Sequence, residues 1–351
     1  MAQLTRRQAT LALAGAAIVP ALRPAFADDQ GQVILGTWGG GTSAVYRKAL
    51  KVFSDRTGIP ARVAEWPDPE PAIRAQASNP QYNAGIAPFM DAYKLHRDGL
   101  LETFSDADLP GIEKLPPEVA VRSKDGRIYG APVNFSCYGI AFNHDLAKSS
   151  DFDSWQSLAD PKWKGKLAMT RVIWSSTLDL TLFAKINGGS EKNIEPGIPL
   201  LKALAANAAV VYTGMAQMNA LLTRGEVVAT PYYSSRFWGS TSVPNAEFQI
   251  PREGGLLQPY MMVVPKGSPH VAAARRLLAF ALEAKTQELL AADSGYMPFN
   301  PEAQLTSEME KKVGMSLPAL RAKLYQPDWG IVAEKQQERI DLVEQLLSQT
   351  R

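Results

Sequence analysis

Short apolar runs alternate along this chain with longer stretches in which apolar residues recur at helical spacing. Val33 to Thr37, Ala61 to Ala64 and Ala84 to Met90 are apolar runs too short for most helices. The stretch between Thr42 and Gly58 instead places its apolar side chains on one helical face. Runs of the first kind predict strands, and stretches of the second kind predict helices. Their alternation predicts an α/β protein with a mainly parallel sheet covered by helices on both faces.

The alternation continues through the second half of the chain. Ile198 to Asn207 and Met215 to Thr223 predict helices on either side of a strand at Ala209 to Tyr212. Val271 to Ala291 predicts one long amphipathic helix. The sequence therefore predicts sheet and helix over the whole chain after its first residues.

The stretch from Gly225 to Val264 predicts a strand, an aromatic loop, a second strand, a tight turn and a third strand. Its loop holds Tyr232, Tyr233, Arg236 and Trp238 directly after the first of these strands. Ligands of open α/β sheets bind outside the carboxyl ends of the strands. Aromatic rings and a guanidinium at such a position provide flat walls and a fixed polar group, which suits ligand binding.

The N-terminus has the pattern of an export signal. Thr5-Arg6-Arg7 is basic, Ala9 to Leu22 is apolar, and Ala25-Phe26-Ala27 is an A-x-A cleavage site before Asp28. We predict a signal peptide at 1–27, cleaved after Ala27, and a periplasmic mature protein. The paired arginines favour the twin-arginine route, although Ala9 stands where that motif usually has Phe. The apolar stretch is shorter than the roughly 20 residues needed to span a bilayer.

Composition narrows the function class. The chain has 37 basic and 35 acidic residues, and the predicted signal carries three arginines without any acid, so the mature body is close to neutral. A nucleic-acid-binding protein would need a basic face, so no such partner is expected. The apolar flanks of the single cysteine, Cys137, predict a buried, inert thiol. With three scattered histidines and no G-x-S-x-G, H-E-x-x-H or C-x-x-C motif, we expect no catalysis, no metal site and no cofactor.

Several short motifs carry a family resemblance. They are the GEV and YY pattern with a following Trp at 225–238, the P-x-E-G-G turn at 251–255, P-K-G-S-P at 265–269, W..L..P.WKG at 155–165 and GY.P.N at 295–300. In this order they resemble the periplasmic solute-binding proteins of ABC importers, and more narrowly the spermidine/putrescine-binding branch. The resemblance implies a monomer that closes on a small-molecule ligand by hinge motion and presents it to an inner-membrane ABC permease.

The resemblance also implies a two-lobed type II periplasmic-binding-protein fold with two chain crossings between the lobes. The first crossing falls in the extended stretch that ends at Asn143, and the second lies near Glu253-Gly254-Gly255. We accordingly expect lobe I to comprise 28–133 and 256–303, and lobe II to comprise 134–255 and 304–351.

The candidate ligand-binding residues lie at strand ends and near the crossings. Trp38 and Gly40 occupy a glycine-rich junction between the first strand and the first helix, where free backbone N–H groups can meet a ligand. Asp91 either caps a helix or faces the cleft. The full set is Trp38, Gly40, Asp91, Asn134, Arg171, Trp174, Tyr232, Tyr233, Arg236, Gln258 and Tyr260.

The sequence also bears on the charge of the ligand. Where polyamine-binding relatives place carboxylates, this chain has Gln258-Pro259-Tyr260 and Arg171-Val172-Ile173-Trp174. A buried ammonium without a carboxylate partner is costly. We therefore expect a small organic anion or zwitterion, held by Arg171, Arg236 or both and stacked between Trp38 and Tyr233. A surface salt bridge is the other role open to each arginine.

Two other ligand classes remain open. A polyamine is the first alternative, because the narrower resemblance is to the spermidine/putrescine-binding branch. Ferric iron is the next, because Tyr232 and Tyr233 resemble the paired tyrosines of ferric-binding proteins, whose phenolates suit a hard trivalent cation. Those relatives usually add a histidine from the first strand-to-helix loop, where this chain has Trp38 and glycines.

Overall fold

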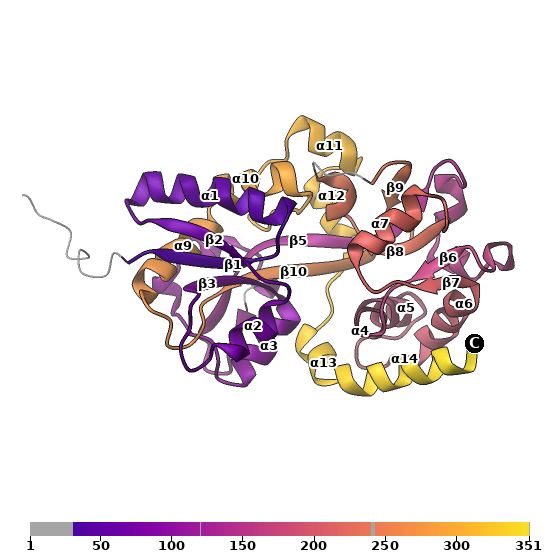
Figure 1. Ribbon diagram of the computed structural model, residues 1–351, viewed down its shortest axis with the longest axis horizontal. Helices are drawn as coiled ribbons and strands as arrows, with labels where there is room; N and C mark the ends of the chain where they lie inside the picture. The colour runs from indigo at the N-terminus through magenta and orange to yellow at the C-terminus, as the bar shows by residue number, and fades with distance from the viewer. Residues whose placement is uncertain (1–30, 120, 240–242, 351) are drawn as a thin grey trace, which may run out of the picture.

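The computed structural model describes residues 31–119, 121–239 and 243–350, and Figure 1 shows them as two lobes along one long axis. One 11-stranded sheet runs through both lobes, with its main path in the order β2-β1-β3-β10-β5-β8-β6-β7. The predicted signal peptide, 1–27, lies outside the described residues. In the part of the chain that the structure describes, helices are too short or too polar to cross a membrane.

The first lobe is built on parallel strands. β1 pairs in parallel with both β2 and β3, as the alternation of strand and helix predicts. Helix α1 ends at Gly58, whose φ of 73° is the left-handed conformation that glycine adopts without steric cost. The elements of this lobe are β1 (Val33–Thr37), α1 (Gly41–Thr57), β2 (Ala61–Glu65), α2 (Pro69–Ala75), β3 (Ala84–Pro88), α3 (Phe89–Arg97), β4 (Val121–Arg122), α9 (Val271–Leu282) and α10 (Ala284–Ser294).

The second lobe has its own core beneath strands and short helices. Helix α4 runs directly into a π-helical turn, Ser175–Asp179, before α5 begins. Its elements are β6 (Leu167–Met169), α4 (Val172–Trp174), α5 (Leu180–Ile186), α6 (Ile198–Asn207), β7 (Ala208–Val211), α7 (Met215–Thr223), β8 (Ala229–Tyr233), α8 (Ser235–Trp238) and β9 (Ala246–Gln249).

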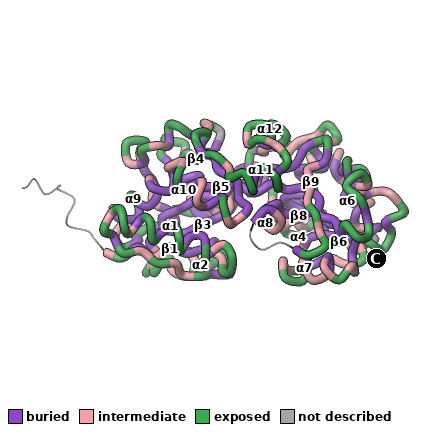
Figure 2. The backbone as a smooth tube through the Cα atoms, turned by 90° about the horizontal axis from the view of Figure 1, so that it is seen from above, coloured by how far each residue is buried: buried purple, intermediate pink, exposed green. Residues whose placement is uncertain are grey.

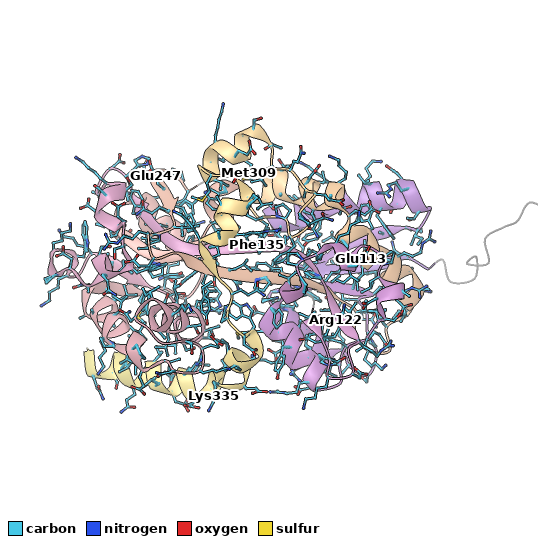
Figure 3. The ribbon with its side chains drawn as sticks, turned by 180° about the vertical axis from the view of Figure 1, so that it is seen from behind. Glu113, Arg122, Phe135, Glu247, Met309 and Lys335 are labelled. Carbon is cyan, nitrogen blue, oxygen red and sulfur yellow. The ribbon has the colours of Figure 1, made fainter. Side chains whose placement is uncertain are left out.

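Two long antiparallel strands connect the lobes. β5 (Ile128–Asn143) and β10 (Gly255–Val263) pair along the middle of the molecule, and all 16 residues of β5 are buried. Figure 2 shows the buried backbone continuing from one lobe into the other along these strands. Phe135, on β5, lies near the middle of the long axis in Figure 3. The two crossings implied by the family resemblance are therefore strands of the shared sheet.

The C-terminal segment crosses between the lobes once more. Met309 and Val313 of α11 (Ser307–Val313) and Leu320 of α12 (Leu317–Ala322) pack in the core cluster of the first lobe. The chain then pairs β11 (Leu324–Tyr325) with β10, and α13 (Trp329–Glu334) packs on α3. α14 (Gln336–Thr350) packs on α4 and α6 of the second lobe, and α11 also contacts α8 of that lobe. The expected assignment of all of 304–351 to lobe II thus differs from how this segment packs.

The expected helix from Val271 to Ala291 is divided into α9 and α10. Glu283 separates them with an extended backbone, φ −64° and ψ 139°. Its carboxylate accepts a hydrogen bond from Arg56 of α1 at 2.7 Å. Periodicity alone does not show this break, because both helices keep an apolar face toward the same core.

Candidate functional site

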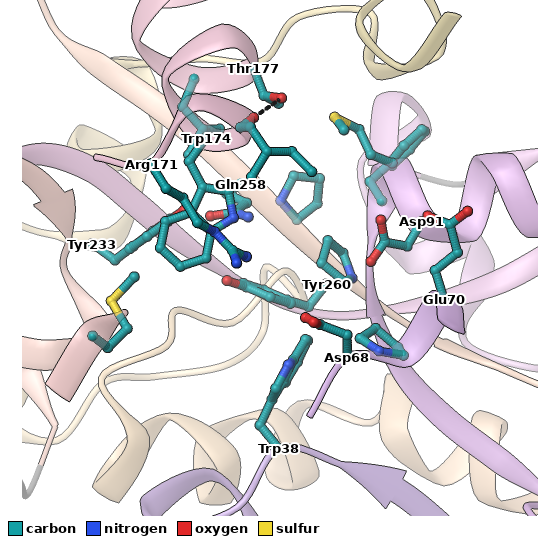
Figure 4. Close-up of a pocket in the computed structure, with 18 of the residues that line it drawn as sticks. Trp38, Asp68, Glu70, Asp91, Arg171, Trp174, Thr177, Tyr233, Gln258 and Tyr260 are labelled. Atoms are coloured by element: carbon teal, nitrogen blue, oxygen red, sulfur yellow. Dashed lines mark hydrogen bonds between the residues drawn. The ribbon is translucent and has the colours of Figure 1, made fainter. Parts of the chain in front are cut away.

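A cleft of about 530 Å³ lies between the lobes, a volume suited to a small organic molecule. Figure 4 shows its walls coming from opposite sides, with Tyr260 of β10 between them. Eight of the expected ligand-binding residues line it. They are Trp38, Asp91, Arg171, Trp174, Tyr233, Arg236, Gln258 and Tyr260.

Arg171 and Trp174 form part of the second-lobe wall. Arg171 precedes α4 at the end of β6, and its Cζ atom lies 3.9 Å from the centroid of the Trp174 ring. Its Nε atom is buried and has no hydrogen-bond partner among the described residues. Trp174 in turn packs edge-on against Tyr233 at 5.8 Å. The stacked guanidinium therefore keeps hydrogen-bonding capacity for a ligand.

Arg236 and Tyr233 complete that wall around the start of α8. Over 31–119, 121–239 and 243–350, neither Arg171 nor Arg236 forms an ion pair. The hydroxyl of Tyr233 also lacks a hydrogen-bond partner in that part of the chain, although the residue is only 7% exposed. A surface salt bridge, the other role open to the arginines, is thus not formed in the described structure.

Gln258 and Tyr260 form the floor of the cleft on β10. They are two positions apart, so a strand directs both side chains to the same face. Tyr260 packs edge-on against Trp38 at 5.7 Å and against Tyr296 at 5.0 Å. Trp38 and Tyr233 lie on different walls, and the Oε1 atom of Gln258 is buried without a donor within the described residues. A ligand can thus be held between aromatic rings while it donates to this amide.

The first-lobe wall is acidic. Asp91 lies in the first turn of α3, whose N-cap is Pro88, and its side chain makes no capping hydrogen bond. Burial, followed by repulsion from Glu70, raises the pKa of Asp91 to about 7. Asp68, Glu70 and one cation, Lys94, line the same wall, so a mainly acidic wall and a basic wall face one cleft from opposite lobes.

A buried carboxylate supports the arginine wall from behind. Asp179, at the end of the π-helical turn, accepts hydrogen bonds from the Tyr138 hydroxyl at 2.7 Å and from the Ser175 hydroxyl at 2.8 Å. Burial raises the pKa of Asp179 to about 7. Since Tyr138 belongs to β5, this network ties the turn that follows Arg171 to the crossing strand.

Three expected residues do not line the cleft. Asn134 is 3% exposed and donates to the Tyr46 hydroxyl at 3.4 Å. Gly40 forms the N-cap of α1 with a φ of 69° and lies outside the lining. Tyr232 is fully buried, and its hydroxyl donates to Asn219 Oδ1 at 2.6 Å. Because consecutive strand residues point to opposite faces, Tyr232 and Tyr233 do not present both phenols to one ion in the cleft.

The cleft also has lining residues that the sequence reasoning missed. They are mainly Asp68, Glu70, Lys94, Thr177, Met215, Tyr296, Trp329 and Gln336. The PDPEP stretch directly after β2 could have indicated the two acids, because it follows a strand end. Nothing local marks Trp329 or Gln336, which reach the cleft through the third crossing of the chain.

The remaining reactive groups lie apart from this site. Cys137 is buried, and burial raises the pKa of its thiol. Within the described residues, no group of three or more His, Cys, Asp and Glu side chains is placed to hold a metal ion. Aromatic rings and a few charged side chains line the cleft, and these are the features of a site for a small organic ligand.

A two-lobed α/β fold with a polar, aromatic-lined cleft between the lobes defines the class of solute-binding proteins. The chain belongs to the bacterial extracellular solute-binding protein family, which it matches over residues 48–316. This confirms the predicted family, and with it a role as the solute-binding component of an ABC transporter.

Individual relatives agree with this assignment. The chain is 24% identical over 283 residues to spermidine/putrescine-binding periplasmic protein 1 of Haemophilus influenzae, with 78% of this chain and 76% of that protein covered. An ABC transporter substrate-binding protein of Bradyrhizobium japonicum is similar in structure, with a TM-score of 0.75 and 22% identity. The match covers 89% of this chain and 99% of that protein. The periplasmic protein AgtB of A. tumefaciens, in complex with agropinic acid, is also similar in structure, with a TM-score of 0.70 and 18% identity. The match covers 91% of this chain and 99% of AgtB. The structural matches confirm the two-lobed fold.

Proposed function

We propose that this protein captures a small carboxylate-bearing organic solute in the interlobe cleft and delivers it to an inner-membrane permease. The observation that carries the proposal is that Arg171 and Arg236 line one wall of the cleft without any carboxylate partner among the described residues. Both arginines are half-buried, and an unpaired guanidinium in a cleft that closes is costly unless a ligand supplies the oxyanion. The protein binds its solute without catalysis, works as a monomer in the periplasm, and loses its signal peptide after Ala27.

The same observation disfavours a polyamine. A linear polyamine would bring further positive charge to a wall that already carries two unpaired guanidinium groups, and like charges in a closed cleft repel. The relative from Haemophilus influenzae is named for spermidine and putrescine, but its identity to this chain is 24%. AgtB, with an acid bound, supports the view that this fold accommodates acidic ligands.

A thermal-shift screen of the mature protein tests the proposal. Candidate ligands are amino acids, di- and tricarboxylates, phosphonates, putrescine, spermidine and ferric citrate. A ligand at about 100 times its dissociation constant stabilises the folded state by about 2.7 kcal/mol, enough to move the melting temperature visibly. We expect shifts with carboxylates. Shifts with polyamines alone, or unchanged carboxylate affinity in both Arg171→Ala and Arg236→Ala, would overturn the proposal.

A further inference from the structure

Asp91 stands out on the first-lobe wall because its carboxylate is unneutralised. No hydrogen bond or ion pair to this group is formed within the described residues, although the side chain is partly buried and lines the cleft. Lys94, one turn along α3, contacts Glu70 at 3.4 Å and also donates to Gln336. Arg74 pairs with Glu70 at 3.0 Å. The nearby cations thus bond to other groups, and Asp91 has no hydrogen-bonded cation of its own.

A second feature of the same wall also points to a ligand. Trp329, on α13, lines the cleft beside α3 and is 3% exposed, yet its indole Nε1 atom has no hydrogen-bond acceptor among the described residues. Buried indole N–H groups normally find a partner. Trp329 and Asp91 line the same cleft from two helices that pack on each other. An aromatic ring with an unpaired N–H and an unpaired carboxylate in one cleft suit an organic ammonium or guanidinium with a polar neighbouring group.

The two unpaired charges of opposite sign belong to different lobes. Asp91 is carried by α3 of the first lobe, and Arg171 begins α4 of the second. Figure 4 shows them entering the cleft from opposite sides, with Tyr260 between them. A ligand that satisfies both charges must span the cleft, so its binding energy draws the lobes together.

We propose that the ligand is a zwitterion with separated charges, whose ammonium or guanidinium pairs with Asp91 while its carboxylate pairs with Arg171 and Arg236. This inference rests on the proposed function and narrows its ligand class. A diamine satisfies Asp91 but places its other ammonium against the arginines. A dicarboxylate satisfies the arginines but places its other carboxylate against Asp91, with Asp68 and Glu70 beside it. The cleft thus selects by repulsion at each end as well as by attraction.

Sets of three compounds with equal chain length test this directly by isothermal titration calorimetry. One set is γ-aminobutyrate, succinate and putrescine, and the other is δ-aminovalerate, glutarate and cadaverine. We expect the amino acid to bind most tightly in at least one set. Asp91→Asn preserves the shape of the side chain. It should reduce the affinity for that amino acid about tenfold or more, and it should leave the affinity for the dicarboxylate unchanged or increased. Asp55→Asn, on the outer surface of α1, is the matched control and should change neither.

The outcomes separate this inference from the proposed function. The amino acid and the dicarboxylate could bind equally well, with affinities that Asp91→Asn leaves unchanged and Arg171→Gln abolishes. That result would overturn the zwitterion inference and leave the proposed binding of a carboxylate standing. Tightest binding of the diamine, unaffected by Arg171→Gln, would overturn both. Melting temperatures of the unliganded variants show that each is folded, and Asp91→Ser provides a second removal of the charge.

Discussion

The guanidinium of Arg171 lies over the ring of Trp174 on the cleft wall, with its Cζ atom 3.9 Å from the ring centroid. This contact holds the side chain in place without a carboxylate, so its charge is oriented but not neutralised. Tyr233 packs edge-on against the Trp174 ring, with the two ring centroids 5.8 Å apart. The arginine wall is therefore positioned before a ligand arrives, which reduces the entropy lost on binding.

This arrangement predicts that Arg171→Lys is not a conservative change. Lysine keeps the charge but loses the planar group that stacks on Trp174 and bonds a carboxylate through two N–H groups. We expect carboxylate affinity to fall about tenfold in Arg171→Lys and further in Arg171→Ala, a loss of about 1.5–3 kcal/mol in the latter. Calorimetric titration measures both, and exposed Arg62→Lys is the control. Wild-type affinity in Arg171→Lys would contradict this account.

The adjacent tyrosines of β8 predict a matched pair of variants. Tyr233→Phe removes an unpaired hydroxyl in the cleft and should weaken ligand binding severalfold, with little effect on melting temperature. Tyr232→Phe removes the donor to Asn219 and should cost about 1 kcal/mol of unfolding free energy while leaving affinity unchanged. Titration and thermal unfolding of both variants distinguish these effects. Equal loss of affinity in the two would mean that both phenols reach the ligand.

Gln336 bonds to both lobes beside the cleft. Its amide accepts from Lys94 of α3 and donates to Thr177 at 3.3 Å. Gln336→Ala should loosen the closed form, weaken ligand binding about three- to tenfold and increase the radius of gyration of the unliganded protein in small-angle scattering. Gln337→Ala, on the same helix but bonded to Asp341, is the control. An unchanged radius together with unchanged affinity would show that this bridge does not hold the lobes.

Asp91 predicts a pH-dependent cost to stability. Its pKa is about 7 in the folded protein and near 4 in an unfolded chain. Burial raises it most, Glu70 and Asp68 raise it further, and Lys94 and Arg74 lower it. Between these pH values the folded state binds the extra proton, so this residue makes stability decrease as pH rises. Asp91→Asn should raise the unfolding free energy at about pH 8 by about 1–2 kcal/mol, and hardly at about pH 4.

Denaturant titrations at the two pH values measure this effect. The same substitution is expected to weaken binding of a zwitterion, so stability and function should change in opposite directions, as is common for charged groups in binding sites. A loss of stability in Asp91→Asn at about pH 8 would show instead that the carboxylate has a stabilising partner in the folded protein.

Local sequence determined much of the fold. The run Val33 to Thr37 is β1 at its predicted bounds, and Ile198–Asn207 and Met215–Thr223 are the predicted helices α6 and α7. Hydrophobic periodicity reports which face of an element is buried, and this information is local. It also indicated the arginine wall, because Arg171 and Arg236 follow strand ends and Tyr233 is the last residue of β8, where ligands of α/β sheets bind.

Only the tertiary structure decided which of these side chains share the cleft. The face of β8 that Tyr233 occupies is set by the register of β8 on β5, and that register also buries Tyr232. The acidic wall and Trp329 are brought to the arginines by the path of the chain between lobes, through β10 and the C-terminal crossing. Sequence fixes the chemistry available at each strand end, whereas the approach of two lobes, which depends on contacts far apart in the chain, determines which charges face one another.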